Sequence, residues 1–462
     1  RYPVGETAYL RGAWTPYAVS KRVVNLALLC AWQAAGGQPP GRPIRAALQK
    51  NADFLAENVE HDVGGNHVVE NGVALTMAGS LLPQGATYWD AGLSTLSDAA
   101  KDQFLSDGGH YERSPMYHAQ VLWGYLAVLD LCTRTGRPYP EVIADTAQRG
   151  MAFLAALTPP DGRIPLLNDA VFGEAPSLDA LRSYASQIDR TGWDYGAPLC
   201  VDQPQSALPD TGYYWLGRSE RDGLLIDGGP VGPAHLPGHS HNDLLSVLLW
   251  VDRQRVVADT GTFSYKPGDR RQYARGVAGH STVQVGDCEP IELGRRFLMG
   301  ERSAPETAFQ SGSIDAFRGA YTAHCGYSHT RSAYGGENWW FVWDRVCGAG
   351  TDSIRSRLML HPDVSVTGSD SPPIAVTGPD GDPLVWVSPL RTDRITRTDG
   401  EYFPRFGEAR PRDVLELQPA EGAEAFGYIL TTTPPGDVTV TTDGTEPITL
   451  TIGSTTVEVP TI

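Results

Sequence analysis

The spacing of apolar residues changes once along this chain, near residue 205, and this change limits the possible folds more than any other feature. Before it, apolar residues recur at helical spacing between Gly, Pro and Asp punctuation, in the stretches 19–35, 44–59, 66–82, 88–105, 116–134 and 142–157. After it, they fall in short β-branched or aromatic runs bounded by turn residues. The pattern predicts packed helices over 1–205 and antiparallel strands, as a sandwich or stacked sheets, over 206–462.

The runs expected to be strands are 213–218, 223–229, 244–251, 255–261, 281–287, 338–346, 353–361, 383–389, 427–433 and 448–459. The segment from about 362 to 425 is rich in Pro, Gly, Asp and Arg, which predicts long loops between strands rather than a third domain. A length of 462 residues is itself more than one ordinary core holds, so two domains are expected.

The charge and the cysteines narrow the class of protein further. A net charge of -17 argues against nucleic acid or an anionic membrane surface as the main partner. No apolar run has the length of a membrane span, and the first residues lack the layout of a signal peptide. The chain begins at Arg1, from which we expect a processed or trimmed protein. Six scattered cysteines without a CxxC pair are typical of buried thiols or of one or two disulfides.

Two histidines precede an apolar run in PGHSHNDLLSVLLWVDRQRVVADTG, residues 237–261. Side chains two residues apart on a strand share a face, so His239 and His241 can both point into one site. Asp259 ends the next run of the expected hairpin, and His280 opens the run after that. Two histidines, one carboxylate and a water form a tetrahedral zinc set. The same residues could instead anchor a loop by hydrogen bonds.

Polar and titratable residues also gather at the expected helix starts of the first half. Asn66 and His67 follow a Gly-Gly break, a place where Asn is also a common N-cap. The stretch DGGHYERSPMYHAQ sets Glu112 and Arg113 ahead of a Ser-Pro helix start, with Tyr117 in the opening turn. These groups indicate either one rim of a cleft or an ordinary polar loop.

A third polar segment, SYKPGDRRQYARGVAGH at 264–280, lies between two candidate metal ligands. It contains Tyr265, and its Arg271 and Arg275 are candidates for binding an acidic group, because a guanidinium can hold a carboxylate through two hydrogen bonds. Solvated surface is the other interpretation of such a charged turn.

Five motifs, in this order, resemble the heparinase II/III-like polysaccharide lyases: NHVVENGVAL, DGGHYERSPMYH, GHSHNDLLSVLLWV, VVADTGTFSY and AGHSTVQV. That family includes heparin and heparan sulfate lyases and alginate lyases. The likeness runs from Trp14 to His361 and implies an incomplete (α/α) toroid followed by an antiparallel β-sheet domain. Part of the family's N-terminal helical region has no counterpart here, so a short toroid is expected.

The resemblance also implies roles for single residues. The implied catalytic residues are Asn66, His67, Tyr117, His239 and Tyr265. The implied ligands of a zinc ion, structural rather than catalytic, are His241, Asp259 and His280. The residues expected to contact substrate are Glu112, Arg113, Arg271 and Arg275.

The expected chemistry is β-elimination, in which the C5 proton of a uronate leaves and the C4 oxygen is expelled. The developing carbanion adds negative charge to the sugar carboxylate, which Asn66 and His67 would neutralise. Tyr117 could act as both base and acid if both groups lie on one face of the sugar. If they lie on opposite faces, His239 would be the base and Tyr117 the acid.

Two other functions stay open at this point. A glycoside hydrolase would need two carboxylates about 5 to 9.5 Å apart, for which Glu70 and Glu112 are the candidates. A catalytically silent carbohydrate-binding or exopolysaccharide-assembly protein would use the same cleft. The acidic chain favours a carboxylate-only polymer such as alginate, hyaluronan or heparosan over densely sulfated heparin. We expect a secreted or periplasmic protein, since polymers are cut outside the cytoplasm, and leave open a homo-oligomer.

Overall fold

The computed structural model describes residues 12–83, 85–190, 205–294, 297–301, 304–350, 353–367, 372–442 and 448–462. The chain divides into two compact units. The helical unit comprises Arg1–Glu112, Tyr117–Leu154 and Pro176–Asp202, and the β unit comprises Arg113–Met116, Ala155–Ala175 and Gln203–Ile462. The β unit therefore includes two segments, 113–116 and 155–175, that precede residue 205 in the sequence.

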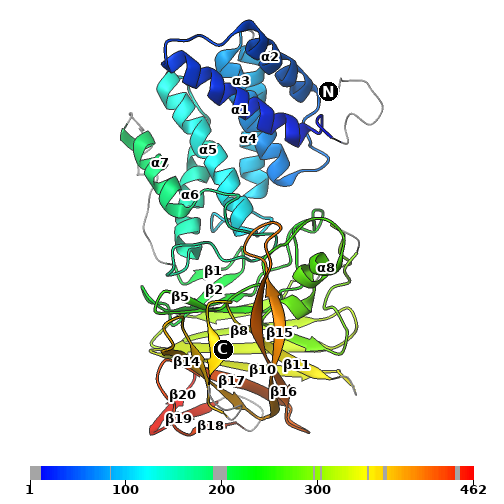
Figure 1. The fold of residues 1–462 in the computed structure, drawn as a ribbon, viewed down its shortest axis with the longest axis vertical. Coiled ribbons are helices and arrows are strands. Elements are labelled where there is room, and N and C mark those ends of the chain that lie inside the picture. Colours follow the sequence, from blue (N-terminus) through cyan, green and yellow to red (C-terminus); the bar gives the residue numbers. More distant parts are fainter. Residues whose placement is uncertain are drawn as a thin grey trace. The chain divides into compact units, whose positions relative to one another are not determined.

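The described part of the helical unit contains seven helices (Figure 1): α1 (Pro16–Ala35), α2 (Arg42–Glu57), α3 (Gly65–Leu81), α4 (Gly85–Gln103), α5 (Pro115–Thr135), α6 (Glu141–Leu157) and α7 (Leu178–Arg190). The six predicted helices are confirmed to within three residues at each end. Prolines begin α1 and α5, where the missing N–H costs no helical hydrogen bond. Helix α7 was not predicted, although its buried residues Leu178, Leu181, Ala185 and Ile188 recur at helical spacing.

Helix α3 is buried almost all round, and it packs closely against α4 through glycines. A Cβ on Gly79 would lie 2.6 Å from the backbone nitrogen of Trp89, and one on Gly92 would lie 2.6 Å from that of Thr76. No side chain fits at those distances, so the two helix backbones approach as only glycine permits. Because α3 is fixed in this way, the polar residues of its first turn are carried on a rigid element.

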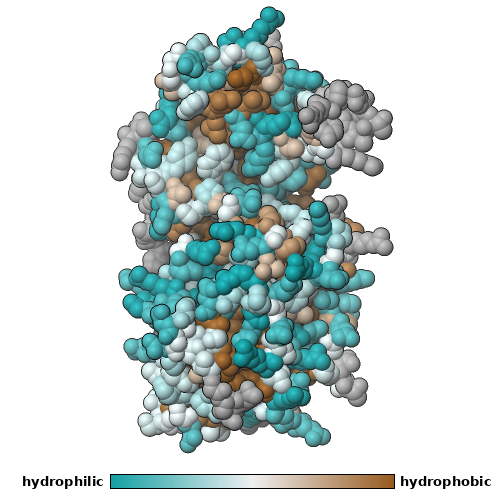
Figure 2. All heavy atoms as spheres, in the orientation of Figure 1, coloured by the Kyte–Doolittle hydropathy of each residue, from teal (hydrophilic) through white to brown (hydrophobic). Residues whose placement is uncertain are grey.

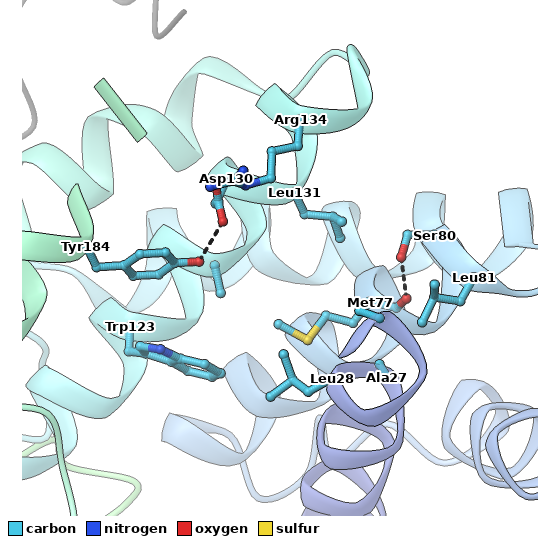
Figure 3. A pocket seen from close by; sticks show the side chains of 12 residues that line it. Ala27, Leu28, Met77, Ser80, Leu81, Trp123, Asp130, Leu131, Arg134 and Tyr184 are labelled. Carbon is cyan, nitrogen blue, oxygen red and sulfur yellow. Dashed lines mark hydrogen bonds and ion pairs between the residues drawn. The ribbon is translucent and has the colours of Figure 1, made fainter. Parts of the chain in front are cut away.

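An apolar pocket opens between α1, α3, α5 and α7 of the helical unit (Figure 3). Beside it, Asp130 accepts hydrogen bonds from the Tyr184 hydroxyl at 3.1 Å and from Nε of Arg134 at 2.6 Å, which ties α7 to α5. Hydrophobic side chains also gather on the surface over α1 (Figure 2), where Leu28 and Trp32 are exposed. None of the helices in the described residues has the combined length and apolar character that a membrane crossing requires.

The β unit contains four antiparallel sheets over its described residues (Figure 1). The five-stranded sheet has the order β1 (Ala207–Leu208), β2 (Tyr213–Leu216), β3 (Gly223–Asp227), β4 (Val247–Val251), β5 (Gln254–Val257). The eight-stranded sheet has the order β12 (Ser365–Thr367), β13 (Ile374–Thr377), β14 (Pro383–Leu390), β17 (Ala425–Thr431), β10 (Trp339–Cys347), β9 (Ser328–Gly336), β8 (Asp315–Thr322), β7 (Glu306–Gln310).

The two smaller sheets complete the stack. The four-stranded sheet has the order β15 (Thr392–Tyr402), β16 (Arg410–Pro419), β11 (Ile354–Met359), β6 (Val283–Val285), and the three-stranded sheet is β18 (Val438–Thr441), β19 (Thr449–Ile452), β20 (Thr455–Glu458). The short helix α8 (Asp269–Arg275) lies between β5 and β6 in sequence.

Strand β10 lies between two cores, because its alternate side chains face opposite ways. Trp340 and Val342 belong to the large core shared with the five- and four-stranded sheets. Phe341 and Trp343 belong to a second core, which Leu450 of the three-stranded sheet joins. The eight-stranded sheet is thus covered on both faces, and the predicted stacked-sheet arrangement follows from this double burial.

The prediction of long loops over 362–425 is wrong, because β12 to β16 occupy most of the described part of that segment. Strands β15 and β16 form a hairpin whose charged side chains pair across the strands, as between Arg397 and Asp413 at 2.8 Å. One face of β15 is largely exposed, so it carries Thr, Asp and Arg instead of apolar residues. The charged residues that predicted a loop therefore lie on β15, an edge strand of the four-stranded sheet.

One disulfide joins Cys288 and Cys325, in agreement with the expectation of one or two such bonds. Cys30 and Cys132 are buried free thiols, while Cys347 is exposed. Cys200 lies outside the described residues.

Candidate active site

His239 and His241 lie in a loop ahead of β4, and both imidazoles contact one buried carboxylate. Nδ1 of His239 lies 3.1 Å from Oδ2 of Asp169, and Nε2 of His241 lies 3.0 Å from Oδ1 of the same residue. The prediction that the two histidines share a strand face is wrong, since both precede β4, which begins only at Val247, and lie in the loop between β3 and β4. A shared hydrogen-bond acceptor, rather than strand alternation, brings them together.

Asp169 also accepts hydrogen bonds from one guanidinium and one hydroxyl group. The guanidinium of Arg271 binds both carboxylate oxygens, with Nη2 at 2.9 Å from Oδ2, and the Thr262 hydroxyl donates at 3.1 Å to Oδ1. Burial disfavours the charged carboxylate, but Arg271 and the histidine hydrogen bonds outweigh it and hold the pKa of Asp169 well below its usual range. This carboxylate is therefore ionised and acts only as an acceptor.

Sequence reasoning missed Asp169. It lies in IPLLNDAVFG, where two polar residues interrupt an otherwise apolar run. Polar residues inside such a run predict a buried, hydrogen-bonded pair, which was the available signal.

The three predicted metal ligands are fully buried in the β unit. Nδ1 of His280 lies 2.7 Å from Oδ2 of Asp259, and the rings of His241 and His280 have their centroids 5.6 Å apart. Nδ1 of His241 and Nε2 of His280 are buried with no hydrogen-bond partner. Orphaned buried nitrogens are costly, and a bound cation would satisfy them, so this donor set fits a zinc ion in chemistry and burial.

Burial shifts the pKa values of the imidazole and carboxyl groups in and around this set of predicted ligands. Burial lowers the pKa of His241 to about 4 even though Asp169 opposes the shift, so its imidazole is neutral, the form that binds metals. Burial also raises the pKa of Asp243 to about 7, and Oδ2 of Asp243 is another buried atom without a partner. The neighbouring Asp227 has its pKa raised well above the usual range by burial and by Asp243.

Three candidate ligand atoms lie within 4.8 Å of one another at a different place in the described residues, formed by Cys288, His324 and Cys325. Two of these are the disulfide cysteines, which have no thiolate to offer while the bond is intact. The His241, Asp259 and His280 atoms do not meet that separation as a set. Their assignment as zinc ligands stays a prediction.

The arginines expected to bind substrate have intramolecular partners in the β unit. Arg271 is buried against Asp169, as described. Arg275 is buried and donates to the backbone oxygens of Ser240 at 3.2 Å and Leu298 at 3.1 Å. Arg113, with φ 55°, donates to the backbone oxygen of Thr211 at 3.0 Å. Substrate binding by these residues stays a prediction, while the contacts seen here shape the loops around His239.

A small aromatic surface, formed by Tyr265, Phe297 and Phe406, adjoins His239 in the β unit. The ring of Tyr265 has its centroid 6.1 Å from that of His239, 5.9 Å from Phe297 and 5.2 Å from Phe406. The two phenylalanines are each 37% exposed. The Arg271 guanidinium lies 5.3 Å from the Tyr265 ring centroid, so the base of this surface is fixed by the residue that binds Asp169.

In the helical unit, the first turn of α3 carries Asn66 and His67. The N-cap of α3 is Gly64 with no side-chain cap, so the N-cap interpretation of Asn66 is wrong. Asn66 is buried. His67 is 33% exposed, its Nδ1 lies 3.2 Å from Oε2 of Glu60, and the ring of Tyr17 stacks on it at 4.4 Å. Glu60 and Tyr17 therefore fix the imidazole while one side of it stays open to a ligand.

Tyr117 lies in the first turn of α5, and its side chain is mostly buried. In the same unit, the His110 backbone N–H donates to Nδ1 of His118 at 3.2 Å, and Nε2 of His118 bonds the Gly150 carbonyl at 2.9 Å. Burial lowers the pKa of His118 to about 4, which keeps it neutral in the helix core. Glu112 is buried, with Oε2 3.6 Å from Nδ1 of His110.

Two sequence families match most of the chain. Residues 44–189 match the family described as Heparinase II/III N-terminus, and residues 201–442 match the family described as Heparinase II/III-like, C-terminal. The chain belongs to the heparinase II/III-like family. The family resemblance stated from the five motifs is thus confirmed.

Several known proteins are similar to this heparinase II/III-like chain. Heparin-sulfate lyases of Bacteroides thetaiotaomicron and Pedobacter heparinus are each 22% identical, over 56% and 76% of this chain and 42% and 54% of their own lengths. This heparinase II/III-like chain therefore spans about half the length of those relatives. FtsZ-localized protein C of Caulobacter vibrioides is 27% identical over 52% of the chain and 40% of that protein.

The fold of this family member matches a solved structure. The crystal structure of a heparan sulfate lyase mutant from Pedobacter heparinus superimposes with a TM-score of 0.73 at 18% identity, covering 99% of this chain and 76% of that chain. The predicted fold class, a helical toroid-type unit followed by stacked antiparallel sheets, is confirmed.

Proposed function

We propose that this protein is a polysaccharide lyase that cleaves a uronate-containing glycosaminoglycan by β-elimination. The observation that carries the proposal is the fixed imidazole of His239, 16% exposed in a family whose similar members include heparin-sulfate lyases. A buried carboxylate binds its Nδ1, and we assign the proton transfer to the other ring nitrogen, Nε2.

The helical unit would supply neutralisation of the uronate carboxylate. Asn66 can donate through its amide, and His67 can donate through Nε2 because Glu60 occupies Nδ1. Hydrogen bonds to the carboxylate oxygens gain strength as the C5 carbanion develops, which lowers the barrier to proton loss.

Proton movement falls to Tyr117 and His239 in this proposal. The base takes the C5 proton, the C4–O bond breaks as the C4=C5 double bond forms, and the acid protonates the departing oxygen. Tyr117 could perform both steps for substituents on one face of the sugar, whereas His239 would be the base when they lie on opposite faces. Tyr265, whose ring lies near His239, would orient the sugar ring.

Zinc, held by His241, Asp259 and His280, is proposed to stabilise the fold of the β unit. Its binding would satisfy the orphaned nitrogens and fix the residues between Asp259 and His280. The chemistry it supplies when bound is cross-linking of the chain segments that carry these three side chains.

The exposed aromatic surface beside His239 supports a carbohydrate substrate. The C–H face of a pyranose is apolar and packs on aromatic rings, and Phe297 and Phe406 offer partly exposed rings of this kind. The acidic chain further supports a polymer of carboxylates over one that is densely sulfated.

Phe406→Ala is expected to raise KM about five- to tenfold while kcat stays within about a factor of two, because apolar stacking on a sugar ring binds substrate and transition state alike. Steady-state kinetics on the best polymer would measure both constants. Phe309→Ala, a half-buried phenylalanine on β7 that contacts Tyr214, is the matched control and should leave KM unchanged. A fall in kcat with unchanged KM in Phe406→Ala would contradict the stacking role.

The proposed function is tested by ultraviolet absorbance of the unsaturated uronate while purified protein is offered heparan sulfate, heparosan, hyaluronan and alginate. We expect a rise with at least one of these and a non-reducing end that carries the double bond. Cleavage that yields saturated ends would instead indicate a hydrolase. That alternative is not favoured, since Glu70 is buried against Lys21 and Glu112 is buried beside His110.

Binding of a polymer without cleavage would favour the non-catalytic alternative. The specific observation for it is the similarity to FtsZ-localized protein C, a relative whose name describes a location rather than a reaction. For location, we propose an extracytoplasmic protein, which the Cys288–Cys325 disulfide supports because such bonds persist in oxidising compartments.

A further inference from the structure

Asp169 is the point at which the proposed proton-transfer residue and the proposed metal ligands meet. Its two carboxylate oxygens divide between two imidazoles: Oδ2 serves Nδ1 of His239, and Oδ1 serves Nε2 of His241. All of these groups belong to the β unit, and the Asp169 side chain has no exposed surface.

A carboxylate has only acceptor atoms, so each imidazole must present an N–H to it. For a neutral ring, the proton on one nitrogen leaves the lone pair on the other. The contact with Oδ2 thus sets the lone pair of His239 on Nε2, and the contact with Oδ1 sets that of His241 on Nδ1. Nδ1 of His241 is the buried atom that lacks a partner.

The backbone around Asp169 prevents the carboxylate from turning away. The Asp169 N–H donates to the His239 carbonyl at 3.1 Å, and the Ser114 hydroxyl donates to the Asp169 carbonyl at 2.9 Å. Asn168 adopts φ 54° and accepts the His241 N–H on its side-chain oxygen at 3.0 Å. The segment before the carboxylate and the histidine loop are therefore hydrogen-bonded in both directions.

Arg271 stabilises the ionised carboxylate of Asp169 and fixes its orientation. It binds both oxygens, and Arg271 is itself buried on α8. Its role as a partner of Asp169 accounts for an arginine that sequence reasoning assigned to substrate.

We propose that Asp169 is a positioning residue that sets the tautomer and orientation of both His239 and His241, so that one carboxylate couples the reacting imidazole to the metal centre. The part concerning His239 as a reacting group rests on the proposed lyase function. The part concerning ring orientation and metal binding does not.

Asp169→Asn tests the proposal with three readouts. The amide has the same shape but one oxygen, and its NH₂ repels the N–H of whichever histidine faces it, so at least one imidazole must turn or change tautomer. We expect zinc affinity to fall about 10- to 100-fold, measured by competition with a chromophoric chelator. We expect kcat to fall at least about tenfold with KM within about a factor of three, because a misplaced base affects the transition state alone.

The third readout is the ring nitrogens of His239 in two-bond proton–nitrogen correlation spectra of nitrogen-labelled protein, assigned by loss of the signal in His239→Gln. In the wild type we expect the proton on Nδ1, and in Asp169→Asn a shift toward Nε2–H. The wild-type part of this measurement needs no substrate, and it uses His239→Gln only to assign the signal. A wild-type His239 protonated on Nε2 alone would overturn the proposal.

Asp161→Asn is the matched control. Asp161 lies in the same 155–175 segment and binds the Arg255 guanidinium with Oδ1 and Oδ2, so its loss removes a partly buried arginine–carboxylate pair elsewhere in the β unit. It should leave zinc affinity, kcat and the His239 signal unchanged. Equal effects of both variants on all three readouts would mean that Asp169 acts only on stability. Wild-type protein that is inactive on every polymer, yet shows the zinc and tautomer effects, would refute the lyase function and retain the positioning role.

Discussion

Tyr117→Phe is expected to lower kcat for formation of the unsaturated uronate about 10²- to 10⁴-fold, the range attributable to a lost general acid or base. The substitution removes one oxygen from a side chain in the first turn of α5, where Pro115 begins the helix. Since the ring stays in place, the packing around this mostly buried side chain is preserved. Initial rates from product absorbance, with thermal unfolding measured beside them, provide the test.

Tyr125→Phe is the matched control for this variant. Tyr125 lies on the same helix, is fully buried, and donates its hydroxyl to the Leu96 carbonyl at 2.9 Å. Its loss should cost stability, about 1 kcal/mol or somewhat more, and leave kcat unchanged. Near-normal turnover in Tyr117→Phe would mean that His239 performs both proton-transfer steps. A similar loss of turnover in Tyr117→Phe and Tyr125→Phe would mean that altered packing of the helix, rather than a lost acid or base, lowers the rate.

The fold class followed from the sequence because apolar spacing records burial directly. Helix α3 and strand β10 are predicted well, since each is largely buried and rich in apolar residues. The hairpin of β15 and β16 was missed for the opposite reason. Its exposed face holds charged residues that pair across strands, such as Arg397 with Asp413. In a single sequence, such charged residues predict a loop rather than a strand.

Some residues of the candidate site could likewise be predicted from the sequence, and others could not. The motifs identified His239, His241, Asp259 and His280 as a group, and the structure places them in one buried region of the β unit. Their common acceptor, Asp169, lies about seventy residues upstream of the histidine loop, and no local spacing connects positions so far apart. Single-sequence reasoning finds side chains that lie near one another along the chain, whereas a hydrogen-bond acceptor from a distant segment appears only once the chain is folded.

The same limit explains Arg271 and Arg275. A cluster of arginines in a turn is chemically suited to an anionic ligand, and the sequence offers no sign that a carboxylate of the protein already occupies one of them. Arg275 binds backbone oxygens, which carry no sequence signature at all.

His280→Ala is expected to abolish zinc binding and to lower the stability of the β unit by about 3–5 kcal/mol. Removing the imidazole leaves the Asp259 carboxylate buried without its partner at 2.7 Å, which is the costly way to break a buried pair. Metal analysis of purified protein and thermal unfolding would measure the two effects.

His324→Ala separates this centre from the alternative group of Cys288, His324 and Cys325. His324 is exposed beside a disulfide, so its loss should leave both the zinc content and the unfolding temperature near those of the wild type. A chelator should then destabilise the wild type and His324→Ala alike, and it should add nothing to His280→Ala, because a ligand stabilises the folded state only where it binds. If zinc were retained in His280→Ala and lost in His324→Ala, the zinc site would have to be assigned to Cys288, His324 and Cys325. The buried nitrogens of His241 and His280 would then need a different hydrogen-bond partner or ligand.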